Sequence, residues 1–73
     1  MKGVLFKYTD KRDGEGEVKG VAFYDEQKPA FSDHKKVLLR LLNEDNTFKT
    51  NEEGKKIIAL KNYSDLTIIG YWD

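Results

Sequence analysis

Apolar and polar residues alternate at the start of the chain, which is the pattern of a half-buried β-strand. In residues 2–9, the apolar side chains Val4, Phe6 and Tyr8 share one face, and Lys7 lies on the other. The spacing therefore predicts a first strand with one face in the core.

A second strand is predicted over residues 17–24, which are also rich in apolar and aromatic side chains. The turn dipeptide Asp13-Gly14 separates it from the first strand, so the two are expected to pair as a hairpin. Gly20 within the strand indicates a bulge or a close backbone approach. A loop should follow, because Pro29 removes a backbone donor, and Phe31 is a candidate anchor into the core.

Residues 35–43 fit two patterns. A helix would bury Val37, Leu38, Leu41 and Leu42, with Ser32 as its N-cap. The lysines at 35–36 and the acidic pair at 44–45 would oppose the dipole of such a helix, and Leu39 would face water. A strand would place Val37, Leu39 and Leu41 on one face, and a short apolar run bounded by turn residues suits a buried strand. We favour the strand.

Two more strands are predicted in the remainder of the chain, over residues 55–60 and 66–72, with a turn or one 3₁₀ turn between them at 61–65. The stretches 43–46 and 51–54 are rich in turn residues, and no internal repeat is evident. In the last strand, alternation would place Leu66, Ile68 and Trp72 on one face and Ile69 and Tyr71 on the other.

Five short strands must close, or nearly close, to hide their edges. The expected fold is therefore all-β, a small five-stranded SH3-like or OB-like barrel formed by residues 1–73 as one domain. The alternative is an α+β fold of ββαββ order in which residues 33–43 are helical.

The composition limits where and how such a domain works. The chain has 73 residues, no cysteine, and 13 basic against 13 acidic residues. A cysteine-free chain without an apolar block of membrane-spanning or signal-peptide length is expected to be cytoplasmic. The charge balance disfavours binding to duplex DNA, which generally needs a basic surplus.

No catalytic or cofactor chemistry is predicted. His34 is the only histidine, and its neighbours Ser32 and Asp33 are too close in sequence to converge with it as a triad. With no cysteine and one histidine, a zinc site would need three carboxylates. We expect no enzyme activity, no cofactor and no metal.

Several short blocks resemble cold-shock domains. The stretch 19–23 (KGVAF) resembles the core of their RNA-binding strand, and residues 48–50 with 53–57 resemble the turn into their fourth strand. The resemblance implies single-stranded nucleic-acid binding through stacked aromatic side chains. Val21, however, stands where that family has its first stacking aromatic.

The leading hypothesis is a non-catalytic module that binds a protein partner or a second copy of itself, because small barrels offer aromatic side chains and edge strands for docking. Single-stranded nucleic-acid binding is the alternative, and no membrane or small-molecule partner is evident. The size also suits a bacterial or phage accessory protein. The candidate binding surface comprises Phe6, Lys7, Tyr8, Lys19, Phe23, Tyr71 and Trp72.

Overall fold

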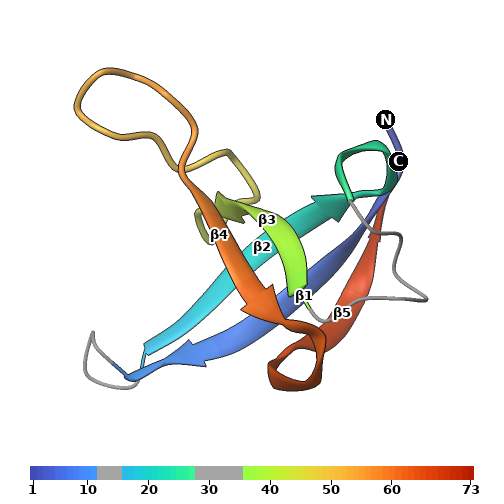
Figure 1. Ribbon diagram of the computed structural model, residues 1–73. Helices are drawn as coiled ribbons and strands as arrows, with labels where there is room; N and C mark the ends of the chain where they lie inside the picture. The colour runs from blue at the N-terminus through green and yellow to red at the C-terminus, as the bar shows by residue number, and fades with distance from the viewer. Residues whose placement is uncertain (12–15, 28–35) are drawn as a thin grey trace.

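Strands make up most of the described chain (Figure 1). The computed structural model describes residues 1–11, 16–27 and 36–73. Its strands are β1 (Gly3–Asp10), β2 (Gly16–Phe23), β3 (Lys36–Leu42), β4 (Ile58–Asn62) and β5 (Thr67–Trp72). The 3₁₀ turn η2 (Tyr24–Glu26) follows β2, and η4 (Tyr63–Asp65) joins β4 to β5. The all-β prediction is confirmed.

The segment with two interpretations is a strand. β3 runs from Lys36 to Leu42 with Val37 and Leu39 fully buried, so the ββαββ alternative is wrong. Other predictions fall outside the described residues: the turn at Asp13-Gly14, the loop around Pro29 and Phe31, and the neighbours of His34.

The strands form one antiparallel sheet in the order β4-β3-β2-β1-β5. Strands β1 to β4 form consecutive hairpins, and β5 returns to pair with the other side of β1. An OB fold, to which cold-shock domains belong, is a Greek-key barrel, whereas here the first four strands form a meander and β5 is added beside β1. The sheet is also not closed, because no ladder joins β4 to β5 among the described residues.

The short link between β4 and β5 forces the sheet to curl. In a flat sheet, four steps of about 4.8 Å would separate these strands by about 19 Å. The link consists of η4 and Leu66 only, and a 3₁₀ segment of that length spans roughly 10 Å. The two edge strands therefore approach each other at the η4 end, and the fold is a partly open barrel.

The concave face of the curled sheet holds the main core. Its buried and partly buried side chains come from β1, β2 and β3 and from Leu66: Val4, Phe6, Tyr8, Ala22, Val37 and Leu39, with Val18, Leu41 and Leu66. The ring of Phe6 meets Tyr63 of η4 edge to face, with centroids 6.1 Å apart. The ammonium group of Lys61 in β4 lies 4.9 Å from the centre of the Tyr8 ring in β1. These contacts bring β4 and η4 against β1, with which they form no ladder, so the sheet curls over this face.

A second, smaller core covers the convex face. It contains Val21, Phe23 and Leu42, with Leu5, Phe48 and Trp72 packed against them. Apolar side chains on both faces of β2 explain why residues 21–23 are all buried. Gly20 makes the predicted close approach, since a Cβ there would lie 3.2 Å from the carbonyl oxygen of Arg40.

Two equivalent turns build the connection between β3 and β4. In each, the first asparagine accepts a hydrogen bond from the residue three positions on, and that residue has a positive φ: Asn43 with Asn46 (68°) and Asn51 with Gly54 (80°). The turns are eight residues apart, and the backbones of Leu41, Lys49 and Ile57 donate to one another in a ring with N···O distances of 2.9–3.0 Å. This repeat was missed at the sequence level.

A bulge in β5 changes which side chains share a face. Leu5 pairs with Gly70 and Phe6 with Ile68, which leaves Ile69 as the extra residue. Leu66 therefore packs in the concave core and Trp72 in the convex core. The prediction that Leu66, Ile68 and Trp72 share one face is wrong, because alternation does not continue through a bulge.

Candidate interaction surface

Exposed apolar side chains concentrate on the two edge strands. In β4, Ile58 is 52% and Leu60 60% exposed, and in β5 Tyr71 is 73% exposed, with Ile68 and Ile69 also exposed. Single domains usually protect their edge strands with charges or prolines. The two strands that end the described sheet thus carry side chains suited to contact with another molecule.

An aromatic cluster lies on the convex face, next to the β5 edge. The ring of Trp72 meets Phe23 edge to face at 5.8 Å and Phe48 at 5.6 Å, and the ammonium group of Lys56 lies 4.2 Å from the centre of the Phe48 ring. Phe48 comes from the β3–β4 connection, and its role was not predicted because four residues between two turns gave no strand signal.

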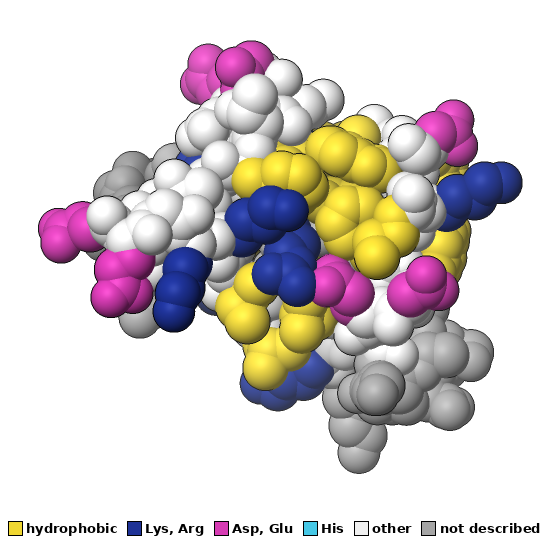
Figure 2. Space-filling view, turned by 90° about the horizontal axis from the view of Figure 1, so that it is seen from above, with side chains coloured by type: hydrophobic (Ala, Val, Ile, Leu, Met, Phe, Trp, Pro, Cys, Tyr) yellow, Lys and Arg dark blue, Asp and Glu magenta, His cyan; other side chains and the backbone are white. Residues whose placement is uncertain are grey.

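A partly buried ion pair crosses the convex face between η2 and β3. Arg40 donates from Nε to Glu26 Oε1 at 3.2 Å and from Nη2 to the second carboxylate oxygen. These hydrogen bonds lower the pKa of Glu26, against the effect of burial, and raise the pKa of Arg40. Glu26 is therefore held ionised, which is the opposite of what a general acid at neutral pH requires. Figure 2 shows hydrophobic side chains gathered at the centre of one face, with basic and acidic side chains against them.

Of the aromatic residues in the predicted binding surface, some are buried in the structure and others are at least partly exposed. Phe6 is 1% and Tyr8 7% exposed, so a partner cannot reach these rings without opening the concave core. Phe23 is buried against Phe48 and Trp72, which are themselves only partly exposed. Tyr71 alone among the predicted aromatic residues is highly exposed.

The two predicted lysines lie on the convex face with partners of their own. Lys7 and Lys19 are opposite each other in the β1–β2 ladder. The ammonium group of Lys7 lies 3.2 Å from the carboxylate of Glu17. Lys19 donates to the backbone carbonyl of Glu44 at 2.9 Å. Neither lysine is next to Tyr71, so the seven predicted residues do not form one surface.

Other sites are limited within the described residues. A hollow of about 450 Å³ at the η4 end is lined by Tyr8, Thr9, Asp10, Lys11, Lys61 and Asp65. It combines two acidic with two basic side chains. No cluster of three histidine, aspartate or glutamate side chains able to hold a metal ion occurs in the described ranges.

Comparisons with protein-family models, curated proteins and solved structures found no match for this chain. The described residues also contain no helix of the length and hydrophobicity required to cross a membrane. The function must therefore be argued from the exposed surface itself.

Proposed function

We propose that this chain is a non-catalytic module that binds a protein partner through its edge strands, in a cytoplasmic setting. The observation that carries the proposal is the exposure of Ile58 and Leu60 on β4 and of Ile68, Ile69 and Tyr71 on β5. Exposed apolar groups on the edge strands of a sheet are typical of docking sites, and tyrosine is enriched among the residues that dominate binding energy.

Capture from a lysate of the source cells tests this proposal. The immobilised chain should retain a protein that the variants Leu60→Lys and Tyr71→Lys retain less well. Glu52→Lys provides the control, because it adds a lysine at an exposed turn position outside both edge strands. Each variant is first checked for an unchanged urea midpoint, so that a loss of binding is not a loss of folding.

The proposal fails if both edge variants retain the partner as well as the parent chain does, or if Glu52→Lys loses it to the same extent. In the first case the partner contacts another surface. In the second case the added positive charge, and not the edge, is responsible for the loss.

Single-stranded nucleic-acid binding is the second candidate, and one observation favours it. Phe48 and Trp72 are partly exposed rings in contact, with Lys56 over one of them, and aromatic rings next to cationic groups are the usual elements of a stacking platform. Titration with oligo-dT at low salt should quench the fluorescence of Trp72 if this platform binds bases. An unchanged signal at high micromolar concentrations would exclude it.

A further inference from the structure

The strand β5 combines an uncharged sequence with acidic residues at both ends. Thr67–Trp72 (TIIGYW) contains no charged residue and no proline, while Asp65 precedes it and Asp73 follows it. The other edge strand differs, because Lys61 lies within β4 and two lysines precede it at 55–56. Lysine on an edge strand discourages the addition of a further strand, so β5 is the better acceptor.

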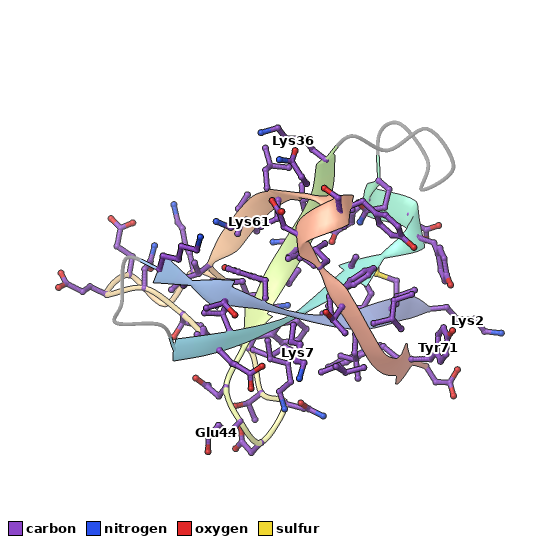
Figure 3. All side chains as sticks on the ribbon, turned by 90° about the horizontal axis from the view of Figure 1, so that it is seen from below. Lys2, Lys7, Lys36, Glu44, Lys61 and Tyr71 are labelled. Carbon is purple, nitrogen blue, oxygen red and sulfur yellow. The ribbon has the colours of Figure 1, made fainter. Side chains whose placement is uncertain are left out.

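The strand that already pairs with β5 shows which chemistry complements it. β1 places Gly3 opposite Trp72 and Lys7 opposite Thr67. Its apolar centre, residues 4–6, is thus framed by two lysines: Lys2 precedes Gly3 as Asp73 follows Trp72, and Lys7 lies opposite Thr67, two positions short of Asp65. Figure 3 shows Lys2 and Tyr71 at the same end of the sheet.

We propose that the outer edge of β5 accepts an extended strand from a partner protein, and that this strand is apolar at its centre with a basic residue at each end. Main-chain hydrogen bonds of such an added strand supply affinity, and side chains at alternate positions supply specificity. Tyr71 and Ile68 supply exposed apolar surface for the side chains of the incoming strand. This inference rests on the proposed protein-binding function and names the partner segment.

A second copy of this chain is a poor occupant of the same edge. An antiparallel β5–β5 pair centred on Ile69 brings Asp65 of each copy towards Asp73 of the other, because both lie four residues from the centre. A parallel pair brings each aspartate towards its own counterpart. Both arrangements place like charges together at each end, which is destabilising.

The test uses a synthetic peptide that copies residues 2–8, KGVLFKY, and a charge-reversed peptide, EGVLFEY. Each is titrated into the ¹⁵N-labelled chain at low salt and followed by NMR. The lysine peptide should shift amide signals of Thr67–Trp72 and bind roughly tenfold or more tightly than the glutamate peptide. The double variant Asp65→Asn and Asp73→Asn, folded as judged by its own spectrum, should lose this preference between peptides.

Four results would overturn the inference. The first is that no amide signal shifts at about millimolar peptide, and the second is that the two peptides bind with equal affinity. The third is that the shifts centre on β2, because the peptide then replaces β1. The fourth is that light scattering shows a dimer that Tyr71→Lys dissociates. If cellular partner capture depends on Leu60 while the peptide does not bind β5, the protein-binding function stands and only the strand-acceptor inference fails. If the peptide binds as expected but no partner is captured, the acceptor edge stands and the binding function fails.

Discussion

The side chain of Gln27 supplies hydrogen bonds where the main-chain ladder between β2 and β3 ends. Removing it should lower the free energy of unfolding strongly. The β2–β3 ladder extends only from the Lys19–Leu42 pair to Val21–Arg40. Beyond it, Gln27 Nε2 donates to the carbonyl oxygens of Phe23 at 2.8 Å and Leu38 at 3.1 Å, and Oε1 accepts from the Leu38 amide at 3.0 Å. The carboxamide thus pairs with Leu38 as a backbone amide would.

The magnitude follows from the groups that Gln27→Leu leaves without partners. Gln27 is 9% exposed. Its loss leaves one amide and two carbonyl groups without hydrogen-bond partners, and each unpaired group lowers the free energy of unfolding by about 1–3 kcal/mol when fully buried. Because Leu38 is half-buried, water replaces part of its lost bonding, and we expect a total of about 2–4 kcal/mol. A folded chain of 73 residues has a stability of about 4–11 kcal/mol, so this variant should lose a large share of it.

Urea unfolding, followed by the fluorescence of Trp72 and by far-ultraviolet circular dichroism, measures this loss. Glu52→Gln, an exposed turn substitution, serves as the control and should change the stability by less than about 0.5 kcal/mol. A loss below about 1 kcal/mol for Gln27→Leu would show that the three hydrogen bonds contribute little to the stability of the fold.

The isosteric variant Gln27→Glu adds a test by pH. The introduced carboxylate would face two carbonyl oxygens, so its pKa should rise in the folded state above its ordinary value of about 4.3. A carboxyl group with a raised folded pKa destabilises the fold as pH rises through the unfolded value. This variant should therefore be more stable, relative to the parent chain, at pH 4 than at pH 7, and the opposite trend would contradict the assigned contacts.

Three further predictions concern packing and charge. Gly3→Ala should lower the free energy of unfolding by about 1–3 kcal/mol, because its Cβ would lie 2.6 Å from a carbonyl oxygen of β2. Gly70→Ala should be tolerated, because the nearest contact of its Cβ would be at 3.5 Å. Equal urea midpoints for the two variants would contradict this. The ion pair of Glu26 stabilises the parent chain above pH 4.5, and this stability is lost as pH falls through the lowered folded pKa of Glu26. Glu26→Gln should remove this stability, so the urea midpoints of the variant and the parent chain should differ at neutral pH and converge in acid. Leu39→Ala should cost about 2–5 kcal/mol, since Leu39 is fully buried, and a loss below about 1 kcal/mol would contradict its place in the core.

The strands could be predicted wherever alternation alone decides the face. Val4, Phe6 and Tyr8 are buried together as their spacing indicates, and β3 was identified because the charges around it oppose a helix. These signals are local, so a single sequence contains them. The fourth strand was predicted to begin at residue 55, three residues before its true start. The second of the two turns ends at Lys55, and β4 starts only at Ile58.

The candidate surface could not be predicted to the same extent, since it depends on contacts between distant segments. Phe6 and Tyr8 appeared available for stacking, but the curl of the sheet encloses them under Lys61 and Tyr63. The bulge at Ile69 was missed, although the neighbouring Gly70, a glycine inside a strand, is the kind of residue that often marks one. The exposure of Tyr71 follows from the place of β5 at the end of the sheet, which only the strand order reveals.

Hydrogen exchange of the β5 amides shows whether the outer edge of this strand is free. If the outer edge of Thr67–Trp72 is free to accept a strand, the amides that point towards β1 should exchange slowly. The alternate amides should then exchange about a hundredfold faster or more. Uniformly slow exchange along the whole strand would show that its outer edge is already hydrogen-bonded within the molecule and would contradict the account.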